Sequence, residues 1–135
     1  PTAILRFALP RLTPWQRLTG QGWKFRAGDL LGILPVGSDV PRFYSLASGQ
    51  ADGFVEICVR KQPGGLCSNQ LALLEPGSKV QAFLRANRGF HPSPARNPVI
   101  LIGAGTGLGP LAGFAVKFAG QVFRPFRFAE WNLFA

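Results

Sequence analysis

The chain has 135 residues, 47 % of them hydrophobic and 16 % charged, which suits a single domain with a packed core and excludes wholesale disorder. Fifteen Lys and Arg against six Asp and Glu give a net charge of +9, which raises the question of a nucleic-acid partner. The basic residues are scattered almost singly, however, and no zinc-finger, basic-zipper or RNA-recognition motif accompanies them. A solvated basic surface, an anionic small ligand or an acidic partner protein accounts better for the charge, and we expect no nucleic-acid partner.

The chain has too few cysteines and histidines for several other classes of site. Two cysteines, Cys58 and Cys67, cannot form a disulfide framework or a four-ligand zinc site, so we expect no metal. A single histidine, His91, also argues against a Ser-His-Asp or Cys-His centre. No apolar run approaches the roughly 18–20 residues of a membrane span, and the first residues lack a signal-peptide pattern. We therefore expect a cytoplasmic protein with no membrane segment in this chain. Met is absent altogether, so the true start of the protein is expected to be missing.

The first two thirds of the chain predict a mainly β structure. Alternating apolar residues or β-prone runs predict strands at 3–9, 30–34, 42–47, 54–61 and 79–85. Residues 10–24 are interpreted as an irregular excursion, and residues 49–53 as a short hairpin connection. One short helix is predicted from Ser68, acting as its N-cap, through Leu74. Residues 1–97 are thus expected to form a small antiparallel barrel with one helix.

The pattern changes after a connection rich in Pro, Arg and Asn at 86–97. Residues 98–102 are continuously apolar, which is typical of a strand buried on both faces of a parallel sheet. A glycine-rich loop follows at 103–109, and Pro110 suits the first position of a helix. Residues 98–135 are therefore predicted to begin, without completing, an α/β nucleotide-binding domain.

Three segments have the chemistry of phosphate or aromatic-ligand sites. The loop with Gly105, Thr106 and Gly107 joins a strand to a helix start, where backbone amides and the helix dipole attract phosphate, although it lacks a Walker A ending and has Leu108 where a Rossmann loop has its third glycine. Gly65, Cys67 and Ser68 repeat this arrangement on a smaller scale. Arg42 and Tyr44 share one face of their strand and would suit a flat, anionic ligand. Taken alone, the glycine loop is equally compatible with a plain turn, while the 65–68 segment is better explained as a helix cap and Arg42 and Tyr44 as ordinary barrel residues.

The order of these motifs resembles the ferredoxin–NADP reductase superfamily. Residues 41–48 (PRFYSLAS) resemble its RxYS flavin motif, residues 65–68 (GLCS) its GxxS/T pyrophosphate motif, and residues 105–110 (GTGLGP) its GTGxxP nicotinamide loop. Residues 25–33 (FRAGDLLGI) and 87–92 (NRGFHP) are similar to the PGDxLGI and NxxFRxP segments of the diflavin branch, to which sulfite reductase flavoprotein and cytochrome P450 reductase belong. The resemblance covers residues 25–114, about two thirds of the chain.

This resemblance implies a Greek-key FAD-binding barrel and a role for each matching residue. Arg42 would neutralise the FAD pyrophosphate, Tyr44 would stack on the isoalloxazine ring, and Ser45, the one catalytic candidate, would place its hydroxyl near flavin N5. Cys58 and Val59 would offer backbone contacts to the flavin edge. Gly65, Cys67 and Ser68 would hold the pyrophosphate, and Gly105, Thr106 and Gly107 would begin the NADPH or NADH site. The protein mainly positions such a cofactor and sets the polarity around it.

The implied function is an NAD(P)H-dependent flavoprotein reductase that passes hydride to FAD and electrons to a haem, a flavodoxin-type or another acceptor. The partner would be an electron-acceptor protein or a flavodoxin-like FMN domain. The chain departs from the diflavin branch in lacking its helical insert between residues 34 and 41, and in having no counterpart of the later nicotinamide-domain strands. Residues 115–135 are interpreted as an aberrant tail, in which Glu130 and Trp131 are weak candidates for a ribose ligand and a flavin-shielding ring. An FAD-binding module without turnover is the alternative, and a basic nucleic-acid-binding barrel a distant third.

Overall fold

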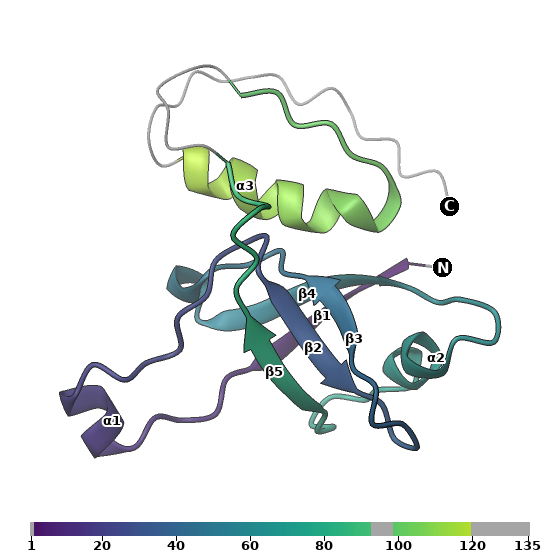
Figure 1. Cartoon of the computed structure of the whole chain (residues 1–135), viewed down its shortest axis with the longest axis horizontal. Coiled ribbons are helices and arrows are strands. Elements are labelled where there is room, and N and C mark those ends of the chain that lie inside the picture. Colours follow the sequence, from purple (N-terminus) through teal and green to yellow (C-terminus); the bar gives the residue numbers. More distant parts are fainter. Residues whose placement is uncertain (1, 93–98, 120–135) are drawn as a thin grey trace.

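A computed structural model describes residues 2–92 and 99–119, which form a small antiparallel β structure overlaid by one long helix (Figure 1). Strands β1 (Thr2–Ala8) and β4 (Phe54–Arg60) pair along their whole lengths. A second sheet has the order β3–β2–β5 and consists of Arg42–Ser45, Leu30–Leu34 and Gln81–Arg85. A bridge between Leu46 and Ile57 joins the two sheets. The predicted antiparallel barrel and the position of every strand in it are confirmed to within two residues at either end.

The core lies between the two sheets, where the alternation of β4 predicts it. Val55, Ile57 and Val59 point inward, while Glu56 and Arg60 do not. Leu46 and Ile57, the residues of the bridge, are fully buried. The same alternation in β1 turns Leu5 and Phe7 onto this core, as predicted.

A buried carboxylate, which the sequence analysis did not single out, holds the start of β2. Asp29 Oδ2 accepts the backbone N–H of Arg26 at 3.0 Å, and its Oδ1 accepts that of Asn87 at 2.9 Å. His91 Nε2 lies 3.0 Å from the same Oδ1, and its Nδ1 lies 3.0 Å from the Ala27 carbonyl oxygen. Both ring nitrogens face acceptors, so both contacts are hydrogen bonds when each nitrogen carries a hydrogen. This network ties the connection after β5 to the turn before β2.

The helices differ more from prediction than the strands do. Residues 10–24 are not wholly irregular, because they contain helix α1 (Pro14–Leu18), capped by Thr13 and Gln16 in a capping box. Helix α2 (Leu66–Ala72) has Gly65 as its N-cap, so the prediction of Ser68 as N-cap is wrong. The Ser68 oxygen instead accepts the N–H of Gln62, at 3.1 Å, on the other side of the glycine turn. The predicted hairpin connection is a short 3₁₀ helix, η1 (Gln50–Asp52).

The segment after the 93–98 gap is only partly as predicted. Residues 99–102 make no strand, and Ile100 and Ile102 are 85 % and 89 % exposed. A strand of a parallel sheet needs neighbours on both sides, and none pairs with this segment within the described residues. The glycine loop does lead into a helix: η2 (Gly105–Gly107) is followed by α3 (Leu108–Ala119), with Pro110 in the first turn rather than at the first position.

Helix α3 lies over the barrel, and α1 lies on an arm at its far side (Figure 1). No helix within residues 2–92 and 99–119 is long and apolar enough to cross a membrane. The same residues contain no cluster of three metal-ligating side chains. Glu130 and Trp131, the two tail candidates, lie outside the described residues.

Candidate functional site

A cleft of about 380 Å³ opens where β3, β4, the start of α2 and the turn η2 meet. This volume falls in the range of about 300–1,000 Å³ that is typical of small-molecule sites. The residues that line it come from four separate parts of the sequence: Arg42, Phe43, Tyr44, Cys58, Arg60, Gln62, Gly65, Leu66, Cys67, Ser68 and Thr106.

The cleft brings together most of the residues that the sequence singles out. Seven predicted site residues line it: Arg42, Tyr44, Cys58, Gly65, Cys67, Ser68 and Thr106. Four do not: Ser45, Val59, Gly105 and Gly107. Ser45 is half-buried at the end of β3, one residue beyond Tyr44 and therefore on the opposite face of the strand. Val59 is 4 % exposed, and its side chain belongs to the core.

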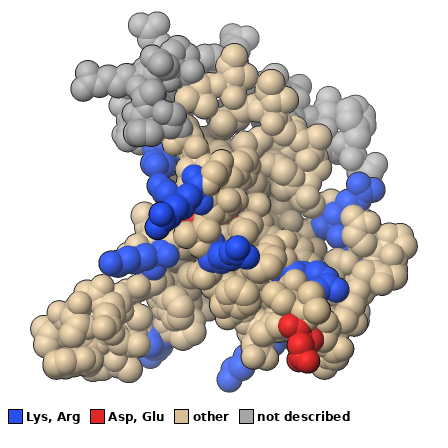
Figure 2. Space-filling view, viewed as in Figure 1, with Lys and Arg blue, Asp and Glu red and all other residues tan. Residues whose placement is uncertain are grey.

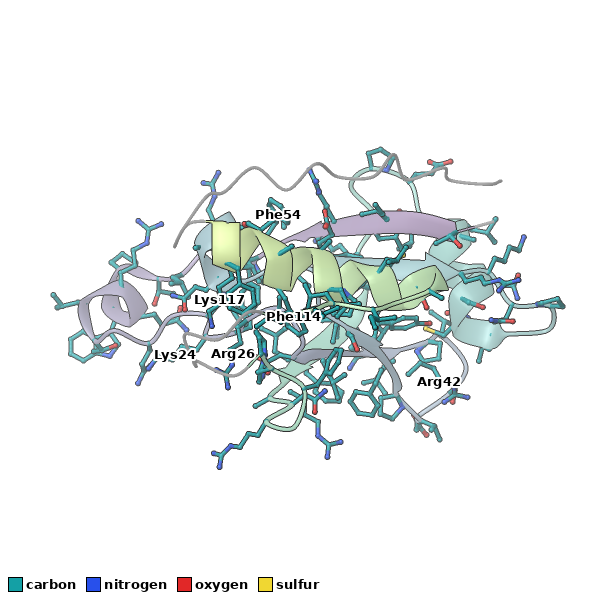
Figure 3. The ribbon with its side chains drawn as sticks, turned by 90° about the horizontal axis from the view of Figure 1, so that it is seen from above. Lys24, Arg26, Arg42, Phe54, Phe114 and Lys117 are labelled. Atoms are coloured by element: carbon teal, nitrogen blue, oxygen red, sulfur yellow. The ribbon has the colours of Figure 1, made fainter. Side chains whose placement is uncertain are left out.

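Two arginines and no acidic residue line the cleft, so it favours an anion. The Arg42 side chain donates from Nη1 to the Val40 carbonyl oxygen at 2.9 Å, which steadies the guanidinium while leaving other N–H groups free to bind a ligand. Figure 3 places Arg42 at the end of the molecule where α3 begins, away from Lys24, Arg26 and Lys117. Arg60 was not among the predicted site residues. The alternation of β4 could have found it, because Cys58 and Arg60 lie two residues apart on one face.

Tyr44 provides an aromatic wall of the cleft. Tyr44 pairs with Leu31 in the β2–β3 ladder, and its side chain packs on the edge of the core. Burial, followed by the neighbouring Cys67 thiol, raises the pKa of the Tyr44 phenol above its ordinary value, and the Arg42 charge opposes this shift only in part. The phenol is therefore neutral under physiological conditions, and its ring is available to stack on a flat ligand.

A glycine turn closes the opposite side of the cleft. Gly64 has φ of 69°, in the left-handed region that favours glycine, and leads into the α2 N-cap. A Cβ on Gly65 would lie 2.6 Å from Ser68 Oγ, so this position has no room for a side chain. The first backbone N–H groups of α2 have no partner within the helix and are available to an anion.

Cys58 lies between the cleft and α3. Burial, with a smaller effect from the Glu56 charge, raises the pKa of its thiol, so the group stays protonated and uncharged at neutral pH. The cleft therefore combines two cations, two cysteine side chains, an aromatic ring and a small-residue turn. Figure 2 shows that Lys and Arg side chains also spread over the face viewed in Figure 1, in agreement with the scattered basic residues of the sequence.

Residues 1–83 match the family model of the oxidoreductase FAD-binding domain. The chain belongs to this family. The match confirms the predicted FAD-binding barrel, the predicted cofactor FAD and the resemblance to ferredoxin–NADP reductases.

Proteins of electron transfer are among those similar to this FAD-binding domain. It is 34 % identical over 97 residues to the toluate 1,2-dioxygenase electron transfer component of Pseudomonas putida, a match that covers 72 % of this chain and 29 % of that protein. It is 36 % identical over 104 residues to the sulfite reductase [NADPH] flavoprotein alpha-component of Cronobacter sakazakii, covering 67 % of this chain and 17 % of that protein. The crystal structure of the Amycolatopsis cytochrome P450 reductase GcoB superposes with a TM-score of 0.70 at 30 % identity, over 88 % of this chain and 34 % of that one. The chain thus spans less than a third of the length of these two curated relatives.

Proposed function

We propose that the cleft is the FAD site of an NAD(P)H-dependent flavoprotein reductase. The observation that carries this proposal is that Arg42, Tyr44 and the Gly65–Ser68 turn, which are far apart in the sequence, line one cleft. Arg42 binds the pyrophosphate, and Tyr44 stacks on the isoalloxazine ring. Gly65, Cys67 and Ser68 hold the pyrophosphate from the other side, through the backbone N–H groups at the start of α2.

The residues present fit this cofactor. The absence of a Cβ at Gly65 leaves the backbone open to phosphate, and both charged groups of the lining are cations. The Ser68 oxygen already accepts one hydrogen bond, from Gln62, so its own hydrogen is available as a donor. The side chains of Cys58 and Cys67 add polarisable surface beside the ring.

The remaining assignments follow the order of the motifs. Ser45, at the end of β3 and outside the lining of the cleft, is assigned to flavin N5 only by its place in the motif, and the backbones of Cys58 and Val59 are assigned to the flavin edge. Gly105, Thr106 and Gly107 begin the nicotinamide site, and Thr106 already lines the cleft. Residues 1–97 make up the FAD-binding domain, and residues 98–135 belong to the nicotinamide-binding part.

Bound FAD would supply the chemistry, accepting hydride from NAD(P)H and releasing single electrons. The chain's own residues bind the cofactor, fix the ring against Tyr44 and keep the pyrophosphate neutralised. The electrons pass to a haem, a flavodoxin-type domain or another acceptor protein. The names of similar proteins support this assignment, because they include an electron transfer component, a P450 reductase and an NADPH-dependent flavoprotein. We propose a cytoplasmic location, which suits two free cysteines.

A specific observation favours a second candidate, an FAD-binding module without turnover. Residues 99–102, predicted to be the first strand of the nicotinamide domain, form no strand, and no partner strand lies beside them in the described part of the chain. A nicotinamide held only by the 105–107 turn would be poorly oriented for hydride transfer.

Two titrations test the proposal. The purified chain should bind FAD with quenching of flavin fluorescence, and should bind it more tightly than FMN, which has no pyrophosphate. Equal affinity for the two flavins would contradict the assignment of Arg42 and the α2 turn. Stopped-flow mixing of the FAD-loaded chain with NADPH then separates the two candidates. Rapid bleaching of the flavin identifies a reductase, whereas a solution that stays yellow identifies a binding module.

A further inference from the structure

Helix α3 can approach the barrel closely because two of its residues have no side chain. A Cβ at Gly113 would lie 2.3 Å from the Ala47 carbonyl oxygen and 2.5 Å from the Ala27 Cβ. A Cβ at Gly109, one turn earlier, would lie 3.0 Å from the Cβ of Cys58. Ordinary contacts between carbon atoms lie at about 3.5–4.0 Å, so a methyl group at position 113 requires the helix to move by about 1 Å or more.

The residue after Gly113 anchors the helix at this short distance from the barrel, here called the height of α3. Phe114 is 4 % exposed and packs edge-on against Phe90, with ring centroids 5.3 Å apart. Its ring lies over Gly28, where a Cβ would be only 2.8 Å from the Phe114 Cζ. Figure 3, viewed from above, shows α3 crossing the barrel with Phe114 labelled beside it, and the ring is buried. The helix is thus seated by two glycines and the large ring of Phe114, together with Pro110, which is also buried.

The height of α3 bears on the cleft because the helix continues directly from η2. Leu108 ends η2 and begins α3, and Thr106, in the middle of η2, lines the cleft with Arg42 and Tyr44. The helix start also covers Cys58, a second lining residue. A displacement of α3 therefore shifts Thr106 relative to the cleft and uncovers Cys58.

We propose that Gly113, assisted by Gly109, is a positioning residue that sets the height of α3 above the barrel and so holds Thr106 at the cleft. The proposal deepens the function proposed above and rests on it, because residues 105–107 are taken there as the start of the nicotinamide site. A misplacement of 1 Å at a reacting centre can slow a reaction by about 100-fold. Gly113 is accordingly a determinant of hydride transfer, not of FAD binding.

Whether Gly113→Ala raises or lowers the melting temperature separates this proposal from a role of Gly113 in helix formation alone. Alanine is a much better helix former than glycine, so helix propensity by itself predicts a higher melting temperature for Gly113→Ala. The packing geometry predicts a lower one. Two controls accompany the variant. Ala112→Gly weakens the same helix at an exposed position without adding an atom at the contact, and Gly89→Ala adds a methyl group where nothing lies within 4 Å.

Four measurements then test the displacement. We expect Gly113→Ala to lower the melting temperature, to speed alkylation of Cys58 measured by peptide mass spectrometry, and to leave FAD affinity close to that of the unmodified chain. Reduction of bound FAD by NADPH should slow by about 100-fold. Ala112→Gly and Gly89→Ala should leave Cys58 alkylation unchanged. A higher melting temperature with unchanged Cys58 alkylation in Gly113→Ala would overturn the proposal.

A cross-link provides a test that holds even where Gly113→Ala does not fold. Disulfides join Cβ atoms about 3.5–4.5 Å apart. A Cβ at position 109 would lie 3.0 Å from that of Cys58, about half an ångström below this range. Gly109→Cys should therefore form a disulfide with Cys58 on mild oxidation, while Ala112→Cys, on the exposed side, should not. Failure of the Gly109→Cys cross-link would refute the seating of α3. Both thiol experiments use the chain without FAD, so a chain that fails to bind FAD would remove the proposed function without deciding this one.

Discussion

Replacing Arg42 with alanine tests the anion-binding half of the cleft. The guanidinium is held at the rim by its hydrogen bond to the Val40 carbonyl oxygen. Little side-chain entropy therefore remains to be lost when it binds a phosphate. A hydrogen bond to a charged group contributes about 1.5–3 kcal/mol. Arg42 is exposed and Arg60 lines the same cleft, so solvent screening and a second cation both soften the loss. We therefore expect the low end of this range, a loss of about tenfold in FAD affinity.

The assay is a fluorescence titration of FAD at two salt concentrations. The difference between the unmodified chain and Arg42→Ala should shrink at high salt, because the interaction is between exposed charges. Arg42→Lys, which keeps the charge but loses the planar fork, should fall between the two. The side chain is exposed, so the melting temperature of the chain without FAD should not change. An FAD affinity equal to that of the unmodified chain at low salt would refute the placement of the pyrophosphate beside Arg42.

Three further residues, and the exposed pair Ile100 and Ile102, give independent predictions. Tyr44→Ala should weaken FAD binding by about 0.5–1.5 kcal/mol beyond the effect of the lost contact area, and should restore flavin fluorescence. Tyr44→Phe should keep the stacking. An unchanged flavin spectrum in Tyr44→Ala would place the ring outside the site. Ser45→Ala should spare FAD affinity but slow reduction by NADPH, and loss of FAD instead would mean that Ser45 is structural. His91→Ala leaves the buried Asp29 carboxylate without one donor and should lower the free energy of unfolding by about 1–3 kcal/mol in urea denaturation, with no such effect from the exposed Arg88→Ala. Ile100→Glu with Ile102→Glu should raise solubility without changing FAD affinity.

The strands were predictable because their periodicity is strong and local. In β4, three inward residues alternate with outward ones over the full length, and the same rule places β1 against it. The grouping of the cleft residues was predictable only through motif order, since Arg42 and Thr106 are 64 positions apart and no local pattern relates them. Arg60 was within reach of the alternation rule, because it shares a face of β4 with Cys58.

The failures have physical causes in contacts that lie far apart in the sequence. Ser68 has the chemistry of an N-cap, but its oxygen is used by Gln62 across the turn, and that contact exists only once the turn has formed. The Asp29 network joins residues 26, 29, 87 and 91, and the sequence offers only a turn-like Gly-Asp pair. The role of Gly113 depends on Ala27 and Ala47 beneath it, so it is visible only in the packed structure. The signal for α1 was present, in contrast, since Thr13 and Gln16 have the spacing of a capping box.

The exposed isoleucines illustrate how a correct pattern can give an incorrect element. The run at 99–102 is as apolar as a central strand, yet Val99, Ile100 and Ile102 are 44 %, 85 % and 89 % exposed. Apolarity favours burial but creates no strand without a neighbour to supply hydrogen bonds, and the described residues offer none there. Exposed apolar residues in a row favour association between copies, so Ile100→Glu with Ile102→Glu should reduce light scattering at high concentration. Neither residue lines the cleft, and surface substitutions usually change stability by no more than about 0.5 kcal/mol. A double variant that instead lost FAD or unfolded would show that this segment packs on the domain in solution, and would contradict its description as an exposed, unpaired segment.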